Sequence, residues 1–323
     1  MNNNSKISVV MLNYNGLKYL KKTIKPILDF DYTNYEFIIV DNGSTDGSIE
    51  YIKKFKDIIL IESPKIREKN FAINYATKIA TGDYLLILDN DCLIDDVYLL
   101  EDLINIYKSN DSCGILSLSF FDFNTLKSKL YGGYFSRLSF YKNIKTVDKD
   151  LFVKFDNQEV GFPHGQGFFI KKTIWKEIGE FDDYLIFGGD DNDIGIRSWL
   201  FGYKNYIYTK SFQIHLGLPE RQDNKKYAIK FRDMFYAGLY TIVKNFKFHN
   251  MVFTLVSYSI FMLIKSIKQS IYRLDIRVIV SFFIGYCTFL KNLPMAIEKR
   301  KEIQSKRVAK EDIFLKIKPL KIK

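Results

Sequence analysis

The first hundred residues alternate between continuous apolar runs and segments with helical spacing. Apolar runs that are rich in β-branched residues and end in polar ones are typical of buried strands. Strand-like runs occupy 6–15, 35–40, 57–63 and 83–91, and helical patterns lie between them at 17–30, from about Ser44, and at about 67–80. Strands that alternate with helices in this way predict an α/β fold with a parallel, doubly wound sheet.

The segment 113–215 is less regular. Strand-like pieces occur at 114–120, 132–141, 165–170 and 205–210, and helices are expected at 171–179 and from about Asp190. After residue 220 a long helical stretch is followed by two apolar runs of 14 and 13 residues, at 251–264 and 278–290. Only the last ~25 residues have the composition of a disordered segment.

Charge divides the chain at the same point. Residues 1–220 hold 26 Lys and Arg against 30 Asp and Glu, whereas residues 221–323 hold 22 against 7. The net charge is therefore −4 in the first part and +15 in the second, which indicates two tasks and an anionic surface as a partner of the second part.

Neither apolar run reaches the roughly 18 residues of a spanning helix, so we expect no transmembrane segment. A basic helix with an apolar face can instead lie in the interface of an anionic membrane. Two alternatives remain open. The runs can be core helices that pack on one another, or they can join two copies of the chain in a homodimer.

Cys92, Cys113 and Cys287 form no CxxC pair, and the N-terminus lacks a basic segment followed by an apolar one. We therefore expect no signal peptide and a reducing, cytoplasmic environment, in which the thiols are small core residues. The basic tail contains no motif that reads nucleic acid, so nucleic acid is not an expected partner.

Polar residues follow three of the predicted strands at their carboxyl ends, where open α/β sheets bind ligands. They are Asn13, Tyr14 and Asn15 after the first strand, Asp41 and Asn42 after the second, and Asp89, Asn90 and Asp91 after the fourth. Any one of them can simply open a turn or cap a helix. As a set they predict a single site.

Asp89 and Asp91 lie two residues apart at the end of a buried strand. On extended backbone the two carboxylates point the same way, and burying both requires a nearby positive charge. Mg²⁺ or Mn²⁺ accepts one or two protein carboxylates and completes its shell with phosphate oxygens and water. Asp89 and Asp91 are therefore candidate metal ligands, and His215 is a third because neutral imidazole suits Mn²⁺.

Asp41 precedes the turn "NGSTDGS", which is not a G-x-G-x-x-G dinucleotide fingerprint. Its carboxylate can accept a hydrogen bond from a nucleobase N–H, while Ser44 is expected to cap the following helix. In "GGDDNDIGIR", Asp190, Asp191 and Asp193 open a helix, and capping requires only one of them. A spare carboxylate there can serve as a general base. We expect His164 and His249 to be structural.

Taken together, these motifs resemble family 2 glycosyltransferases of the GT-A fold, which build bacterial polysaccharides from nucleotide sugars. The resemblance covers about residues 6–240 and rests on "SVVMLNYNGLKYLKKTI", "IIVDNGSTDGS", "NFAINYATKIATGDYLLILDND" and "GEFDDYLIFGGDDNDIGIRSWLFGYK". It implies a doubly wound mixed sheet in a catalytic domain, 1–220, with a nucleotide-sugar half (1–112) and an acceptor half (113–220). A helical, membrane-associating region, 221–323, would follow.

The resemblance also implies residue roles. Asp41 would contact the base, Asp89 the ribose or metal, and Asp91 and His215 the Mn²⁺ or Mg²⁺ ion. Asp191 would be the catalytic base, with Asp190 where the family usually has Glu, so either of the two can abstract the proton. Arg197 would anchor a helix. The full set expected to bind the nucleotide sugar is Asn13, Tyr14, Asn15, Asp41, Asn42, Ser44, Arg67, Asn74, Asp89 and Asn90.

The implied reaction is inverting transfer from a UDP- or dTDP-sugar to a glycan hydroxyl. The acceptor would be lipid-linked, the product a capsule or O-antigen, and the location the cytoplasmic face of the bacterial inner membrane, with rhamnosyltransferases among the relatives. Two rivals remain. A sugar nucleotidyltransferase usually has a Gly-rich basic loop after strand one, which "NYNGLKYL" lacks. A non-catalytic scaffold would not need the aspartates.

Overall fold

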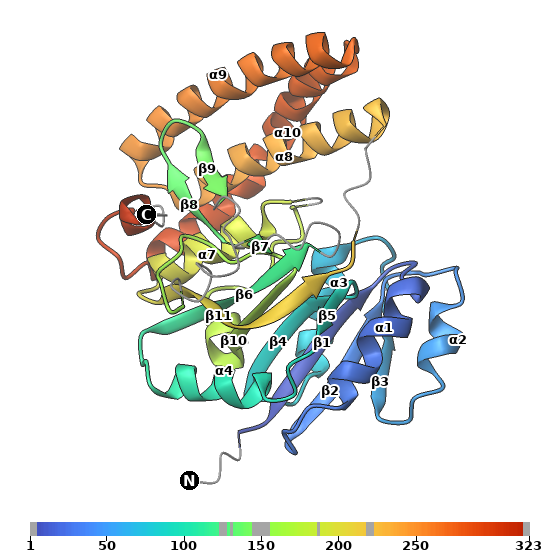
Figure 1. The fold of residues 1–323 in the computed structure, drawn as a ribbon. Coiled ribbons are helices and arrows are strands. Elements are labelled where there is room, and N and C mark those ends of the chain that lie inside the picture. The colour runs from blue at the N-terminus through green and yellow to red at the C-terminus, as the bar shows by residue number, and fades with distance from the viewer. Residues whose placement is uncertain are drawn as a thin grey trace.

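The computed structural model describes residues 5–122, 128–129, 132–143, 156–185, 188–217 and 223–318. Within these residues one mixed sheet runs in the order β3-β2-β1-β4-β10-β6-β11-β5, and β7 pairs with β6 (Figure 1). Its strands are β1 (Ile7–Asn13), β2 (Tyr35–Asp41), β3 (Ile58–Glu62), β4 (Tyr84–Asp89), β5 (Cys92–Ile94), β6 (Cys113–Asp122), β7 (Ser128–Lys129), β10 (Gly167–Lys171) and β11 (Lys204–His215).

The first four strands are parallel, as the apolar runs predict. β1 lies between β2 and β4, with Val10 opposite Ile38 on one side and Ile87 on the other. All three side chains are buried, because helices cover both faces of a parallel sheet. β10 then pairs antiparallel with both β4 and β6, which makes the sheet mixed.

Most helices of this part were predicted from the sequence, but the helix at 99–108 was not, and two predicted elements need correction. They are α1 (Leu17–Leu28), α2 (Ser48–Ile52), α3 (Lys69–Ile79), α4 (Leu99–Lys108), α6 (Lys172–Glu177) and α7 (Asp190–Leu200). The expected start of a helix at Ser44 is wrong: α2 begins at Ser48, after Gly47 in a left-handed conformation with φ of 86°. Segment 132–141 is also not one strand but the start of a hairpin, β8 (Gly133–Ser136) and β9 (Phe140–Asn143).

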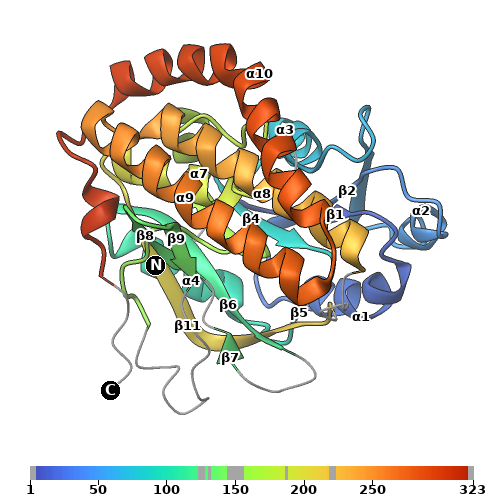
Figure 2. The same ribbon diagram turned by 90° about the horizontal axis from the view of Figure 1, so that it is seen from above.

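The C-terminal region forms three long helices, α8 (Asn224–Asn245), α9 (Phe248–Arg273) and α10 (Arg277–Lys306), and a short 3₁₀ helix, η2 (Ile313–Lys316). They lie together on one side of the sheet (Figures 1 and 2). The expectation of disorder over the last ~25 residues is wrong for those up to residue 318, because Phe314 is completely buried and Arg307 pairs with Asp312 at 2.9 Å. Residues 319–323 lie outside the described residues.

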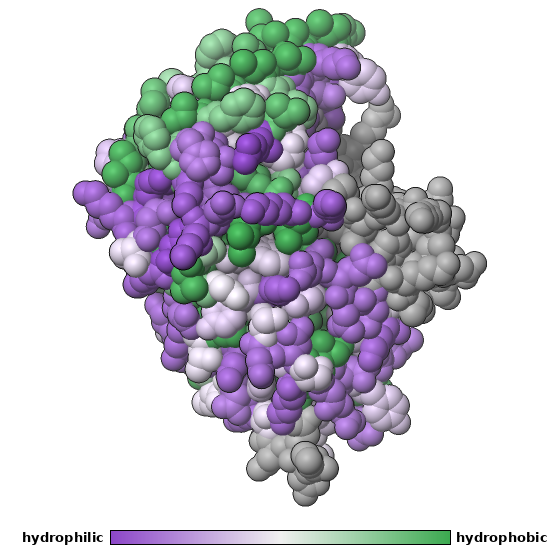
Figure 3. Space-filling view, turned by 90° about the vertical axis from the view of Figure 1, so that its left-hand side faces the viewer, coloured by the Kyte–Doolittle hydropathy of each residue, from purple (hydrophilic) through white to green (hydrophobic). Residues whose placement is uncertain are grey.

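α9 and α10 carry much of the exposed apolar surface. Figure 3 shows apolar residues gathered over the end of the molecule where α9 lies, above a hydrophilic belt. Among the described residues these two helices are long and apolar enough to cross a membrane, a test that core helices of soluble proteins also pass. The apolar runs of 14 and 13 residues therefore underestimated the lengths of both helices.

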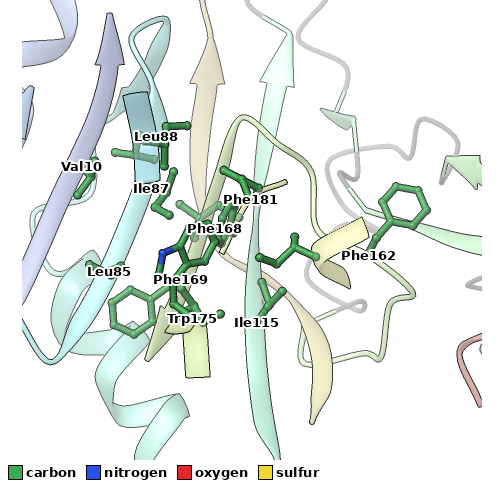
Figure 4. Close-up of a cluster of buried hydrophobic side chains, with 14 of the residues drawn as sticks. Val10, Leu85, Ile87, Leu88, Ile115, Phe162, Phe168, Phe169, Trp175 and Phe181 are labelled. Carbon is green, nitrogen blue, oxygen red and sulfur yellow. The ribbon is translucent and has the colours of Figure 1, made fainter. Parts of the chain in front are cut away.

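Aromatic side chains fill the core where β10 joins the two halves of the sheet. Phe168, Phe169, Trp175 and Phe181 gather between β4 and β6 (Figure 4). The Trp175 and Phe181 rings meet edge to face with centroids 4.9 Å apart, and the Trp175 indole N–H donates to Thr77 of α3. This packing fixes β10 against β4 and so positions the strand ends that matter below.

A buried charge network joins α8 and α10 to the sheet domain. The Lys244 ammonium of α8 donates to Asp182 at 2.6 Å and to Asp193 at 2.8 Å. Lys299 of α10 contacts the second oxygen of Asp182 at 2.7 Å, and Arg197 pairs with Asp193 at 2.7 Å. Asp193 therefore holds the C-terminal helices and is not a helix cap, since α7 begins after Gly189 without a side-chain cap.

The network also fixes protonation states. Burial alone would raise the pKa of Asp182, but Lys244 and Lys299 hold it well below its ordinary value. The pKa of Asp193 is lowered in the same way, with Arg197 and Lys244 opposing burial. Both carboxylates therefore stabilise the fold above the unfolded-state pKa of about 4, and this stability is lost as the pH falls through the lower folded-state values.

The contacts of Arg197 agree with its expected role of anchoring a helix. Its guanidinium donates to the carbonyl oxygens of Ile178 and Glu180 as well as to Asp193. These contacts tie α7 to the loop before it, and Arg197 is absent from the cleft described below.

Replacing Lys244 tests this network. Lys244→Met keeps the length of the side chain but leaves two buried carboxylates without their shared cation, so we expect a loss of about 3–5 kcal/mol in the free energy of unfolding. Urea denaturation measures it. The control is Lys301→Met, at an exposed position of α10. Equal stability of the two variants would contradict the role given to Lys244.

Candidate functional site

A cleft of ≈ 810 Å³ opens at the carboxyl ends of β1, β2 and β4, and α7, α8 and β9 complete its walls. Six of the residues predicted from the sequence line it: Tyr14, Asn42, Arg67, Asp89, Asp190 and Asp191. The other predicted residues do not. They are Asn13, Asn15, Asp41, Ser44, Asn74, Asn90, Asp91 and His215.

Asp41 shapes the turn after β2. One carboxylate oxygen accepts from Asn13 at 2.8 Å and from the Ser44 hydroxyl at 2.6 Å. The other accepts from the backbone N–H groups of Gly43 and Ser44. Both oxygens are thus used within the chain, and Ser44 serves this turn instead of capping α2.

Asn42, the next residue, faces the cleft. Its side-chain oxygen is buried and has no hydrogen-bond partner among the described residues. A buried acceptor without a donor is costly, so this oxygen is suited to receive an N–H from a ligand. Tyr14 and Arg67 lie at the same cleft, with the guanidinium carbon 5.6 Å from the centre of the Tyr14 ring. They offer flat surfaces next to this acceptor.

Three asparagines stabilise the loops at the strand ends through hydrogen bonds. Asn90 donates to the Asn13 side chain at 2.7 Å, and the Asn15 side chain accepts from the backbone of Thr45. A Cβ on Gly16 would lie 1.8 Å from the Asn90 amide nitrogen, so only glycine fits there. These asparagines hold the loops that line the cleft and do not line it themselves.

Asn74 lies elsewhere. Its amide donates to the Phe181 carbonyl at 2.8 Å and accepts from the Phe181 N–H at 3.1 Å. This pair of hydrogen bonds fixes α3 to the loop before α7. The structure does not bring Asn74 to the cleft with the other predicted residues.

Lys69, which sequence reasoning missed, bridges the two halves of the site. Its Nζ lies 3.7 Å from Asp89 of β4 and 3.5 Å from Asp190 of α7. Burial alone would lower the pKa of Lys69, but Asp89, Asp190 and Asp191 raise it above its ordinary value. The feature of the sequence that could have indicated Lys69 is its position at the start of the helix that precedes the fourth strand.

Other residues of the cleft were also not singled out. His164, expected to be structural, lines the cleft and accepts a hydrogen bond from the backbone N–H of Gln166. Tyr141 of β9 and Lys230 and Met234 of α8 form the opposite wall. No sequence motif marks these residues, because their elements reach the cleft only through the tertiary packing.

Asp191 differs from its neighbour in electrostatic setting. Burial raises its pKa to about 7, and the negative charge of Asp190 adds to this, although the Asn192 N–H and Lys69 oppose it. Asp190 has an ammonium partner at 3.5 Å, whereas no ion pair joins Asp191 to another of the described residues. Asp191 is therefore the carboxylate able to take up a proton near neutral pH.

The electrostatics of Asp89 follow from its position. Burial raises its pKa, Lys69 opposes the rise, and Asp91 and Asp190 add to it. Asp89 is the last residue of β4, and Asn90 and Asp91 form a turn before β5. The expectation that Asp89 and Asp91 share one face of an extended segment is therefore wrong.

Asp91 instead pairs with His215, and Asp91 Oδ2 lies 3.0 Å from His215 Nε2. β11 runs five residues beyond its expected end, so that His215 lies opposite Cys92 of β5. A Cβ on Gly217 would lie 2.4 Å from the Asp91 carboxylate, so glycine keeps space beside the pair. An oxygen and an imidazole nitrogen with free space suit Mn²⁺.

The pair would need ligands from a substrate to complete a metal site. Among the described residues no group of three or more His, Cys, Asp or Glu side chains is arranged to hold a metal ion. One or two protein ligands with phosphate oxygens is the usual arrangement for Mg²⁺. Asp91 and His215 thus fit a metal ion that binds together with a phosphorylated ligand.

Comparison with known sequences gives one family. Residues 8–179 match the model of "Glycosyl transferase family 2". A poly-β-1,6-N-acetyl-D-glucosamine synthase of Staphylococcus epidermidis is 32% identical over 117 residues, which cover 34% of this chain and 27% of the relative. The matched segment therefore spans only about a quarter of that protein.

Solved structures of low sequence identity share the fold. Staphylococcus aureus TarS 1–349 in complex with UDP-GlcNAc has a TM-score of 0.60 at 12% identity, covering 96% of this chain and 90% of that one. The mannosyltransferase PcManGT of Pyrobaculum calidifontis, in complex with GDP-Man and Mn²⁺, has a TM-score of 0.57 at 16% identity, covering 90% and 88%. The mixed α/β sheet expected from the sequence is thereby confirmed.

Removing the Lys69 charge should change the titration of Asp191. Because the ammonium opposes the rise in the pKa of Asp191, Lys69→Met should move that pKa above about 7. Carbon-13 NMR of Asp-labelled protein measures it, and Asp191→Asn assigns the signal. Lys21→Met on the exposed side of α1 is the control. An unchanged Asp191 titration in Lys69→Met would show that the two charges are not coupled.

Proposed function

The chain belongs to glycosyl transferase family 2, and on this premise we propose that it transfers a sugar from a nucleotide diphosphate to a glycan hydroxyl with inversion at the anomeric carbon. The observation that carries the proposal is the unequal pair Asp190 and Asp191 in the cleft. One is bound to Lys69, and the other has a pKa of about 7.

The donor would enter along the strand ends. The buried oxygen of Asn42 is suited to a nucleobase N–H, and Tyr14 and Arg67 to the flat faces of the base. The sugar diphosphate would then lie near Asp89 and Lys69. We propose UDP or dTDP as the carrier, because uracil and thymine both present one imide N–H to an acceptor.

A divalent cation, Mn²⁺ or Mg²⁺, would be held by Asp91 and His215, with Asp89 on the ribose or beside the metal. When bound, the ion neutralises the charge of the diphosphate leaving group. The support within this chain is the pairing of Asp91 with His215 beside Gly217, where a Cβ would lie 2.4 Å from the Asp91 carboxylate. A structural neighbour of the same fold was solved with Mn²⁺.

Asp191 would act as the general base. It takes the proton of the acceptor hydroxyl as that oxygen bonds to the anomeric carbon, and the bond from this carbon to the diphosphate oxygen breaks. The nucleoside diphosphate leaves with the electron pair, and the single displacement inverts the anomeric centre. Lys69 holds Asp190 in place through their ion pair, so Asp190 positions the site while Asp191 moves the proton.

The acceptor would be a lipid-linked glycan in the synthesis of a surface polysaccharide such as a capsule or O-antigen. The matched region of the S. epidermidis relative belongs to a polysaccharide synthase, which supports this class of product. The apolar α9 and α10 and the +15 charge of residues 221–323 support a peripheral position at the cytoplasmic face of the bacterial inner membrane.

Substituting the two aspartates separately tests the assignment of the base. Asp191→Asn should lower transfer about 10²- to 10⁴-fold and leave nucleotide binding intact. Release of the nucleoside diphosphate is measured over a panel of nucleotide sugars. If Asp190→Asn abolished transfer and Asp191→Asn did not, the roles would have to be exchanged.

The pH dependence tests the same residue. In the wild type kcat/KM should rise about tenfold per pH unit up to about pH 7 and then level off, because the protonated carboxyl cannot accept a proton. Asp190→Asn should move this inflection to lower pH, since the charge of Asp190 raises the pKa of Asp191. A profile without an inflection near pH 7 would contradict Asp191 as the base.

Thermal melting tests the metal ligands without an acceptor. Mn²⁺ with UDP should raise the Tm of the wild type more than either alone, because the ion and the diphosphate complete one another's coordination. Asp91→Asn should lose this added shift. Asp95→Asn, exposed near the start of α4, should keep it. A shift that persists in Asp91→Asn would exclude Asp91 as a ligand.

A further inference from the structure

α9 and α10 present a continuous apolar face to solvent. We define the α9–α10 face by side chains that are between 41% and 69% exposed: Val252, Val256, Ile260, Ile264, Ile267 and Ile271 of α9, and Val280, Phe283, Ile284 and Leu290 of α10. In α9 they recur every three or four residues and so form one stripe, and in α10 they fall at positions 280, 283, 284 and 290. Phe253 and Phe261 of α9 and Ile297 of α10 are exposed to a similar extent. Figure 3 shows the apolar surface over this end of the molecule. An exposed stripe of this length marks an interaction site.

The opposite faces of the same helices are packed on the body of the protein. In α9, Tyr258 and Met262 are buried, and the Tyr258 ring contacts Phe235 of α8. In α10, Phe282 stacks on Phe235 with centroids 4.6 Å apart. A Cβ on Gly285 would lie 3.0 Å from the Arg232 carbonyl oxygen, so α10 and α8 approach closely. Both helices are therefore fixed to α8.

This packing is incompatible with a membrane crossing, although both helices are long enough for one. α8 also carries Lys230 and Met234, which line the polar cleft. If α9 and α10 crossed a bilayer while packed on α8, the charged residues of α8 and the cleft would enter hydrocarbon, where charges are expensive. Separating the helices from α8 would instead break the aromatic packing. Helices parallel to the membrane plane avoid both costs.

The positive charge of the helices that form the face favours an anionic surface as its partner. Residues 248–297, which carry the face, contain 5 Lys and Arg and 1 Asp. A second copy of the chain would place the same positive charges opposite one another, whereas the core of a protein interface is poor in charge. Anionic lipid headgroups complement this charge, and the apolar stripe can enter the boundary between headgroups and acyl chains.

We propose that the α9–α10 face docks on an anionic bilayer with both helices parallel to the membrane plane and neither crossing it. This rests on the peripheral attachment proposed above and adds its geometry. Because α8 both supports this face and forms a wall of the cleft through Lys230 and Met234, docking holds the acceptor side of the cleft one helix away from the lipid surface.

Cys287 provides a probe in the unaltered sequence. It is exposed on α10 between Phe283 and Leu290, whereas Cys92 and Cys113 are buried. It also lies near the middle of any membrane crossing that begins at Arg277. A fluorophore such as nitrobenzoxadiazole on Cys287 therefore reports how deeply α10 enters a bilayer.

The labelled protein is mixed with phosphatidylcholine vesicles that contain or lack phosphatidylglycerol. We expect a blue shift and stronger emission only with phosphatidylglycerol, and stronger quenching by lipids with a nitroxide near the headgroup than by lipids with one near the chain end. Deepest quenching at the chain end would mean that α10 crosses the membrane and would overturn the proposed geometry. No response to either vesicle would overturn docking itself.

A charged double variant tests the face. Ile260→Glu with Ile264→Glu adds two carboxylates to the stripe without touching the packed side, and we expect vesicle partition to weaken at least about tenfold. Ile79→Glu, at a similarly exposed isoleucine of α3, is the matched control and should bind as the wild type does. Equal binding of the double variant would contradict the assignment of the face.

Donor hydrolysis in vesicle-free solution separates the two proposals. The double variant should hydrolyse the nucleotide sugar as the wild type does, since neither residue lies at the cleft. If the wild type bound vesicles normally but did not hydrolyse the nucleotide sugar, this would count against the proposed reaction only. A wild-type dimer that the double variant dissociates, without vesicle binding by either, would assign the face to a second copy of the chain.

Discussion

The ion pairs of Lys244 with Asp182 and Asp193 hold the rest of the site in place. Asp193 lies in the first turn of α7, two residues after Asp191, so the charge that binds α8 also fixes the start of the helix that presents the candidate base. Asp182 lies in the loop that α3 holds through Asn70. One buried ammonium therefore links the α7 side of the cleft, α3 and the C-terminal helices.

The same electrostatic reasoning explains why two adjacent aspartates differ. The two carboxylates are neighbours on one helix, but Lys69 of α3 pairs with Asp190, and among the described residues no ion pair joins it to Asp191. Burial raises the pKa of Asp191, and the charge of Asp190 adds to this because two acids side by side resist ionising together. The difference between their electrostatic settings is thus a property of the assembled domain.

The strand order of the first half and the placement of the polar strand ends were predictable, because buried parallel strands have continuous apolar runs and ligands bind at their carboxyl ends. Asp191 at the start of a helix was predictable for a similar local reason. Lys69 was not, since its partners are about 20 and 120 residues away along the chain. The pairing of Asp91 with His215 required the extension of β11 beside β5, and a turn after Asp89 overrode the local two-residue spacing. Ser44 and Asn74 were placed incorrectly because their polar groups have partners within the chain. The Ser44 hydroxyl donates to Asp41 in a turn, and the Asn74 amide bonds to the loop before α7.

α8 has one side in the cleft and the other beneath the apolar helices, through Met234 and Phe235, which are consecutive residues. A helix is stiff along its axis, so a rotation of α8 that loosens Phe235 must also shift Met234. A protein held at a surface searches for its substrate in two dimensions, and its encounter rate then depends on area instead of volume. With the docking proposed above, the width of α8 would set the height of the cleft above that surface, and glycans much longer or shorter than this height would meet the cleft less often.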